Sequence, residues 1–162
     1  MKKSGFSLIE LLIGLVILSI LLIFVVPFGF SIYKKNQLEF LEADMSTGIR
    51  YSRNIALLYE LPLALTPLPG AKDFSCGMIL FIDNKNHQIG DDDKLIHLWR
   101  WQCKNVNINW IGFQANNYLL FAANLKNSST SGHFEINVGG LNSKLVVNRY
   151  GRIEKKFSSN QA

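Results

Sequence analysis

The sequence has little of what enzyme active sites are commonly built from. Its three histidines, His87, His97 and His133, stand in different segments of the chain. No serine occurs in a nucleophile-elbow pattern, and no glycine-rich loop of the phosphate-binding type is present. Two cysteines and scattered histidines also disfavour a zinc site. We therefore expect a structural subunit that uses no metal and no cofactor, and not an enzyme.

Ionisable side chains are missing from a long stretch near the N-terminus. None occurs in the twenty residues from Leu11 to Phe30, and a helix of that length, at about 1.5 Å per residue, extends about 30 Å, the thickness of the hydrocarbon core of a bilayer. A cleaved secretory signal is the alternative, but its apolar region is about 7–15 residues long and ends at a small-residue cleavage site. We predict one membrane-spanning helix. Lysine pairs precede and follow it, so charge alone leaves its orientation open.

One carboxylate, Glu10, interrupts the apolar N-terminus. A carboxylate at the end of an apolar span is costly to bury, so a cationic partner or water at the membrane surface is expected. The next lysine or arginine along the chain is Lys34, about 36 Å away on a helix. The partner of Glu10 is therefore water or another molecule.

The stretch "GFSLIELL", residues 5 to 12, resembles the processing motif of type IV prepilins and of type II secretion pseudopilins. In that family a prepilin peptidase cuts after the glycine, and the new N-terminal residue is methylated. The resemblance implies a leader over residues 1–5, cleavage between Gly5 and Phe6, and docking of Glu10 on the α-amino group of a neighbouring subunit's Phe6. An unpaired carboxylate in a core of apolar helices would hold its subunit out of register. Pro27 would kink the helix, as is common in pilins.

An amphipathic pattern follows over residues 31–60, in which apolar residues recur at steps of three and four or their sums. The predicted buried face comprises Leu38, Leu41, Met45, Ile49, Ala56 and Tyr59, and the predicted exposed residues are Lys34, Lys35, Glu39, Glu42 and Arg53. We expect this helix to pack one face on a globular domain. It should end before the prolines of "ELPLALTPLPG", residues 60 to 70.

The remaining residues, 61–162, are predicted to form a β-rich periplasmic region. Apolar or alternating runs predict strands over 76–83, 94–103, 106–110 and 133–138, and two more within 144–157 around a turn at Tyr150 and Gly151. Such a pattern is typical of an antiparallel sheet or small sandwich. The predicted fold class is α+β: a long N-terminal helix, with a membrane half over 6–30 and an amphipathic half over 31–60, packed on a small antiparallel β-domain.

The two cysteines are predicted to form a disulfide. If the strands on either side of residues 89 and 90 form a hairpin, directly opposed residues have numbers that sum to about 179. That register places Leu80 opposite Trp99 and Cys76 opposite Cys103. A bridge implies an oxidising compartment and favours a periplasmic ectodomain, whereas two free buried thiols are the alternative.

Three further stretches resemble the GspH/FimT group of type IV minor pilins and type II secretion pseudopilins: "SRNIALLYELPLAL" (52 to 65), "CGMILFIDNKNHQIGDDDKLIHLW" (76 to 99) and "LVVNRYGRIEKK" (145 to 156). The resemblance implies a single-pass inner-membrane protein that assembles with other pilins or pseudopilins through its helix. Its function would be pilus assembly or initiation, with the minor pseudopilin of a secretion system as the alternative. "LIELL" and Pro27 favour the pilus. The acidic loop within the second stretch has Lys85 and His87 where an EF-hand needs oxygen ligands, which favours a solvated hairpin loop.

The excess positive charge lies in the last segment. Residues 31–143 hold ten Lys/Arg and ten Asp/Glu, whereas residues 144–156 hold five basic residues against Glu154. Members of the group implicated in DNA uptake carry a Gly-Arg-x-Arg pattern; Gly151 and Arg152 match it, and Glu154 replaces the second arginine. Binding of double-stranded DNA for uptake in natural transformation is therefore a second candidate function, and a solvated tail is the alternative. The candidate residues are Lys144, Arg149, Arg152, Lys155 and Lys156.

Overall fold

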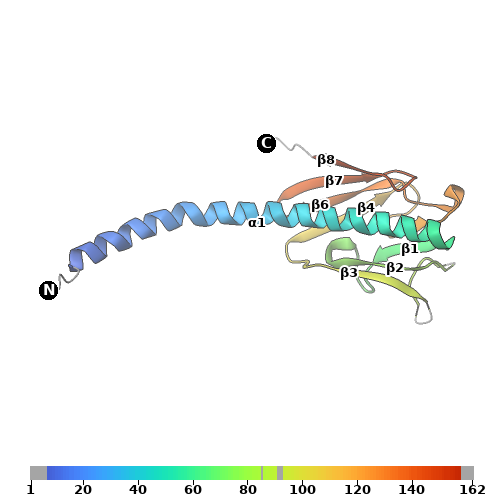
Figure 1. The fold of residues 1–162 in the computed structure, drawn as a ribbon, viewed down its shortest axis with the longest axis horizontal. Coiled ribbons are helices and arrows are strands. Elements are labelled where there is room, and N and C mark those ends of the chain that lie inside the picture. The colour runs from blue at the N-terminus through green and yellow to red at the C-terminus, as the bar shows by residue number, and fades with distance from the viewer. Residues whose placement is uncertain (1–6, 85, 91–92, 158–162) are drawn as a thin grey trace.

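One long helix carries a β-domain on its C-terminal half, and its N-terminal half extends away from the domain (Figure 1). The computed structural model describes residues 7–84, 86–90 and 93–157. Helix α1 spans Leu8–Tyr59 and ends where Glu60 adopts a left-handed conformation, two residues before Pro62. The predicted fold class, α+β with a long helix packed on antiparallel strands, is confirmed.

The described strands form two four-stranded antiparallel sheets. The first has the order β3-β2-β1-β5, with β1 at Leu63–Pro67, β2 at Gly77–Ile82, β3 at Leu95–Arg100 and β5 at Leu119–Phe121. The second has the order β4-β6-β7-β8, with β4 at Val106–Gly112, β6 at Gly132–Val138, β7 at Leu141–Val147 and β8 at Ile153–Phe157. Two short 3-10 helices, η1 at Phe74–Cys76 and η2 at Leu125–Asn127, lie in the connections.

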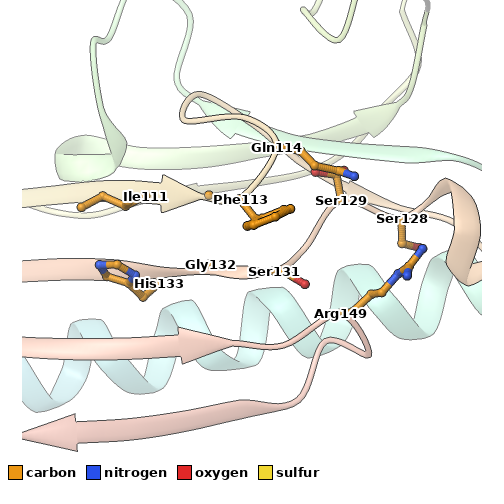
Figure 2. A pocket seen from close by; sticks show the side chains of 10 residues that line it. Ile111, Phe113, Gln114, Ser128, Ser129, Ser131, Gly132, His133 and Arg149 are labelled. Carbon is orange, nitrogen blue, oxygen red and sulfur yellow. The ribbon is translucent and has the colours of Figure 1, made fainter.

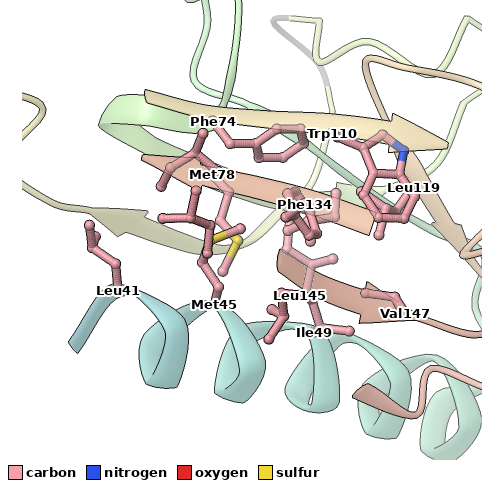
Figure 3. Close-up of a cluster of buried hydrophobic side chains, with 14 of the residues drawn as sticks. Leu41, Met45, Ile49, Phe74, Met78, Trp110, Leu119, Phe134, Leu145 and Val147 are labelled. Atoms are coloured by element: carbon pink, nitrogen blue, oxygen red, sulfur yellow. The ribbon is translucent and has the colours of Figure 1, made fainter. Parts of the chain in front are cut away.

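The core is shared by α1 and both sheets (Figure 3). Five of the six residues predicted for the buried helix face are in it: Leu38, Leu41, Met45, Ile49 and Ala56. The ring of Phe134 on β6 packs edge-on against Phe74 of η1 at a centroid distance of 5.1 Å, and its contact with Trp110 on β4 is tilted, with the centroids 4.6 Å apart. Such aromatic pairs contribute beyond their buried area. The helix half that carries the domain is therefore fixed to it along five turns.

Three predictions for the helix surface are wrong, those for Tyr59, Glu42 and Arg53, and Arg53 is described with the site below. Tyr59 is 61% exposed, because it lies in the last turn at the end of the domain. Glu42 is only 4% exposed although it was expected on the surface. A carboxylate this deeply buried requires polar partners, and these are described with the site below.

Two strands, β1 and β5, were not predicted. The segment that contains β1 was interpreted only as a helix stop, yet Leu63, Ala64 and Leu65 are fully buried between β2 and β5. Pro62 precedes the strand and Pro67 is its last residue, so neither proline occupies its middle. Strand β5 has three residues, which is too short for a recognisable alternating pattern.

The predicted disulfide between Cys76 and Cys103 is present, with the two Cα atoms 4.5 Å apart. The hairpin of β2 and β3 is also confirmed, but the predicted register is wrong, because Leu80 lies opposite His97 and Trp99 lies opposite Met78. Cys76 belongs to η1 rather than to β2, and Cys103 lies beyond the end of β3. The bridge therefore closes the open end of the hairpin outside the ladder, whereas the prediction assumed a bridge directly across it.

Candidate functional sites

The N-terminal half of α1 is an uncovered apolar surface. Within this helix, an 18-residue window is long and apolar enough to cross a membrane, and none of it is buried in the structure. The exposed apolar side chains continue to Phe30, Ile32 and Tyr33, just before Leu38 enters the core. Since a helix that is hydrophobic on all sides requires lipid or other protein around it, this half is suited to contact with lipid or with other helices.

Glu10 lies in the first turn of α1 and caps the helix. The backbone N–H of Ser7, the residue that precedes the helix, donates to Glu10 Oε2 at 3.0 Å. This is one half of a capping box, in which a glutamate three residues into the helix satisfies a backbone donor at its start. The side chain is exposed and therefore remains accessible to a second partner. Gly5 and Phe6, the predicted cleavage and methylation positions, lie outside the described residues.

The helix continues through position 27, and its axis bends within the N-terminal half (Figure 1). A proline in a helix interior removes one backbone hydrogen bond and commonly bends the axis. Assignment of this bend to Pro27 stays a prediction.

A buried polar cluster joins the domain half of α1 to the second sheet. Glu42 on α1 accepts a hydrogen bond from Ser143 Oγ on β7 and forms an ion pair with Lys155 Nζ on β8. The Lys155 side chain is 35% exposed, so its amino group reaches inward from the edge of the sheet. Lys155 was predicted as a DNA-binding candidate, but the structure gives it a partner inside the domain.

Strand alternation explains why Lys155 is separated from Lys156. Side chains alternate between the two faces of a strand, and directly opposed residues of an antiparallel pair share a face. Lys155 lies opposite the buried Leu145, on the face toward the core. Lys156 lies opposite Lys144, so both are on the outer face, where Glu135 flanks Lys144 on the other side.

Arg149 and Arg152 lie on the turn between β7 and β8, and both are exposed. Asn148 stabilises this turn, because its Oδ1 accepts from the backbone N–H of Tyr150 and of Arg152, each at 2.9 Å. Gly151 adopts φ 73° there, a conformation that disfavours other residues. The predicted turn at Tyr150 and Gly151 is confirmed.

The same turn packs against the end of α1. A Cβ atom at Gly151 would lie 3.4 Å from Cγ of Arg53, so the arginine stem and the turn are in contact. The Arg53 guanidinium donates to the carbonyl of Ala122 at 2.5 Å, just after β5. Arg53 was expected to be exposed on the helix surface, but it is partly buried and connects three segments. Two stretches that resemble the same family, the helix end and the Gly-Arg turn, thus meet in space.

A cleft of about 630 Å³ opens beside this turn, at the end of the domain where α1 terminates. We call it the distal cleft. Figure 2 shows Phe113 in its middle, with Gln114 and Ser131 nearby and Arg149 reaching toward Ser128. None of the described residues that line it is acidic; they are Ile111, Gly112, Phe113, Gln114, Ser128, Ser129, Ser131, Gly132, His133 and Arg149.

Of the residues that line the distal cleft, only Arg149 was predicted from the sequence as a binding residue, and it was predicted as part of the basic C-terminal segment. Its walls come from the β4–β5 connection, the segment before β6 and the β7–β8 turn, which are brought together only by the order of the second sheet. Phe113 directly follows β4, but its exposure is known only from the structure.

An aromatic cluster lies where α1 meets the edge strand β3. The ring of His97 is 4.2 Å from Trp99 and 5.5 Å from Tyr51, measured between centroids. Asp44, two turns earlier on α1, is partly buried, and this burial raises the pKa of its carboxyl above 3.8, while the charge of His97 acts in the opposite direction. Asp44 is therefore harder to ionise in the folded protein than in the unfolded chain.

The acidic loop between β2 and β3 is held by its own hydrogen bonds. Asp83 Oδ1 contacts His87 Nδ1 at 2.8 Å, and Asp93 Oδ2 accepts from Asn84 Nδ2 and from the Gly90 N–H, both at 2.6 Å. Within the described residues, no group of three or more His, Cys, Asp or Glu side chains is arranged to hold a metal ion. Asp83 and Asp93, the carboxylates of the described part of this loop, therefore have partners within the loop itself.

Comparisons with known proteins point to one class of protein. The profile of the prokaryotic N-terminal methylation motif matches residues 1–26. Two crystal forms of the type IV minor pilin FimU from Pseudomonas aeruginosa have a similar fold, with TM-scores of 0.59 and 0.56 at 18% and 17% identity. They cover 78% and 76% of this chain, and 92% and 95% of FimU. No curated protein matches the sequence.

Proposed function

We propose that this chain, which combines the prokaryotic N-terminal methylation motif with the fold of a type IV minor pilin, is a minor subunit that takes part in assembly or initiation of a type IV pilus. Prepilin peptidase would remove residues 1–5, and the mature chain would stand in the inner membrane with its β-domain in the periplasm. Other pilins would then be its partners along the N-terminal half of α1.

The observation that carries this proposal is the division of α1 into two halves. One face of the half from Leu38 onward is buried in the domain, whereas no residue of the 18-residue apolar window before it is buried. An uncovered apolar surface of this length needs lipid before assembly and other helices afterwards. Glu10 is the one acidic group on that half, and it is exposed. It is therefore the residue that can set the axial position of the subunit.

Mass spectrometry of the protein from its native membrane tests the proposal. The mature chain is expected to start at N-methylated Phe6, and a bulky residue in place of Gly5 is expected to leave the leader attached. An unprocessed Met1 terminus beside an active prepilin peptidase would contradict the pilin assignment. The pseudopilin alternative is separated by phenotype, because deletion of a pilus subunit reduces surface pili, whereas deletion of a pseudopilin reduces protein secretion and leaves pili intact.

DNA binding is a second candidate function, and the observation in its favour is the exposed Arg149 and Arg152 on one turn. Lys144 and Lys156 add two charges on the outer face of the second sheet. Glu154, opposite Val146, lies between the turn and this pair on the same face. Arginine and lysine at these positions suit contact with phosphates, which supplies affinity without sequence preference.

A further inference from the structure

We infer that the distal cleft takes one unpaired nucleotide of a nucleic-acid strand, with its base stacked on Phe113 and its phosphate held by Arg149. The inference rests on the DNA-binding candidate above and gives it a specific ligand. The DNA-binding candidate requires only exposed basic side chains, and the phosphates of a duplex can bind to these. The distal cleft adds an aromatic ring and neutral polar groups, which a duplex backbone does not use.

The size and position of the cleft fit a ligand. Its volume of about 630 Å³ lies within the range of sites for small molecules, about 300–1,000 Å³. The β7–β8 turn, which carries Arg149 of its lining, lies at the end of the domain farthest from the apolar half of α1 (Figure 1). A single nucleotide fits in this space, and a base-paired helix does not.

Phe113 provides an exposed ring on a fixed backbone. Its side chain is 89% exposed, yet its backbone N–H donates to the carbonyl of Ser131 at 2.9 Å. Beneath the loop, the indole N–H of Trp110 donates to the carbonyl of Ala115 at 2.9 Å. An exposed aromatic ring on a hydrogen-bonded backbone offers a face on which a base can stack.

Two opposed glycines form the floor of the cleft. Gly112 and Gly132 are direct partners across β4 and β6. A Cβ atom at Gly132 would lie 2.5 Å from the carbonyl oxygen of Ile111 and 2.7 Å from the ring of Trp110, so no larger residue fits there without a shift. At these two positions the floor of the cleft is backbone alone, and Trp110 packs closely against it.

Polar groups around the ring match the remaining parts of a nucleotide. Among the described residues, the side chains of Gln114, Ser129 and Ser131 make no hydrogen bond within the protein, and they remain available to a ligand. An amide can pair with the edge of a base, and hydroxyls can bind a sugar or a phosphate. The guanidinium of Arg149 is suited to two hydrogen bonds with one phosphate.

The ring favours an unpaired strand over a duplex. In a duplex both faces of each internal base are covered by neighbouring base pairs, so Phe113 can stack only on an unpaired base or on a duplex end. We therefore expect the full-length protein in nanodiscs to bind a fluorescein-labelled 15-residue oligothymidylate more tightly than a 15-base-pair duplex that carries the same label. Fluorescence anisotropy at 50 mM salt measures both affinities.

Substitution of Phe113 tests the stacking contact. Phe113→Ala is expected to weaken single-strand binding roughly 5- to 150-fold, the range that one stacked base contributes, and to leave duplex binding unchanged. Phe113→Tyr should keep the affinity, because the ring is retained. Tyr150→Ala is the matched control, because Tyr150 is 66% exposed on the neighbouring turn and does not line the cleft. Thermal unfolding confirms that each variant is folded.

The outcomes separate this inference from the DNA-binding candidate. If Phe113→Ala leaves single-strand binding unchanged while Arg149→Gln and Arg152→Gln weaken duplex binding, the inference is wrong and the candidate stands. If neither strand binds at 50 mM salt, both fail. If an acidic oligosaccharide binds and its binding depends on Phe113 while the oligothymidylate does not bind, the cleft is a saccharide site and the inference is overturned.

Discussion

Glu42 and Lys155 form an ion pair between α1 and the last strand, although 113 positions separate them in the sequence. Glu42 is almost fully buried, and Ser143 Oγ donates a hydrogen bond to its other oxygen. The pair fixes the edge strand of the second sheet to the helix. It also removes Lys155 from the exposed basic surface that the sequence suggested.

Loss of one partner of this pair is expected to destabilise the domain. Lys155→Met leaves the Glu42 carboxylate buried without its cation, and removal of one partner from a fully buried pair costs about 3–5 kcal/mol. Because Lys155 is 35% exposed, a smaller loss of about 1–3 kcal/mol is expected here. The double variant Glu42→Gln with Lys155→Met should recover part of it. Urea unfolding of the four proteins measures the coupling, and a loss in the double variant equal to the sum of the two single losses would show that the pair contributes nothing.

Substitutions at Glu10 can separate its charge from its cap. Glu10→Gln keeps an acceptor for the Ser7 N–H, since glutamine also completes a capping box, but it removes the charge that would pair with a neighbouring α-amino group. Both Glu10→Gln and Glu10→Ala are expected to insert in the membrane and to be reduced in sheared filaments, as quantified by immunoblotting. If Glu10→Gln is incorporated as well as the parent and Glu10→Ala is not, the cap and not the charge is the required feature.

The bridge between Cys76 and Cys103 should stabilise the β-domain. It closes a loop of 27 positions, for which the chain-entropy account gives about 3–4 kcal/mol. Reduction, or the variant with both cysteines replaced by serine, is therefore expected to lower the midpoint of thermal unfolding. Non-reducing peptide mapping of periplasmic protein should recover the two cysteines linked. Recovery of both as alkylatable thiols from native protein would count against the bridge.

Asp44 should make stability depend on pH in a direction opposite to that of most carboxylates. Burial raises its pKa in the folded state above 3.8, so the group stabilises the fold when protonated, and this contribution is lost as the pH rises through the folded pKa. Asp44→Asn is therefore expected to raise the unfolding midpoint at pH 7 and to change it little at pH 3. Glu39→Gln, an exposed neighbour on α1, is the control. A larger gain at pH 3 than at pH 7 would contradict this assignment.

Duplex binding by the exposed cations should be weak and dependent on salt. If four phosphates are neutralised, affinity should fall on the order of 100-fold between 50 and 200 mM salt. The combined change of Lys144, Arg149, Arg152 and Lys156 to glutamine is expected to abolish binding, and Glu154→Arg to strengthen it. Lys155 is left unchanged in this experiment, because its loss would disturb Glu42. Binding that persists in the combined variant would show that these residues are only a solvated surface.

Much of the architecture follows from patterns that act locally. The apolar run, the helical spacing from Leu38 to Ala56 and the alternation in β4 and β6 each describe one element and its buried face. The wrong or absent predictions concern positions whose environment is set by segments far away in the sequence. Glu42 resembles an ordinary surface residue until Ser143 and Lys155 are placed beside it, and β1 is recognisable as a strand mainly through its two neighbours. The distal cleft depends on the order of the second sheet, which no local pattern encodes.

Because α1 is one continuous helix of 52 residues, a rotation of its N-terminal half about the axis also turns the β-domain. The length of α1 is about 78 Å, and each residue is rotated about the helix axis by about 100° relative to the one before it. Tension on the N-terminal half therefore reaches the β-domain as an axial pull on Glu42 and its partners rather than as the stretching of a tether. One residue inserted between Tyr33 and Leu38 would rotate the whole domain by more than a quarter turn relative to Glu10. The direction in which the distal cleft faces is thus set by the rotational position of the apolar half about the helix axis, although the residues that line the cleft come much later in the chain.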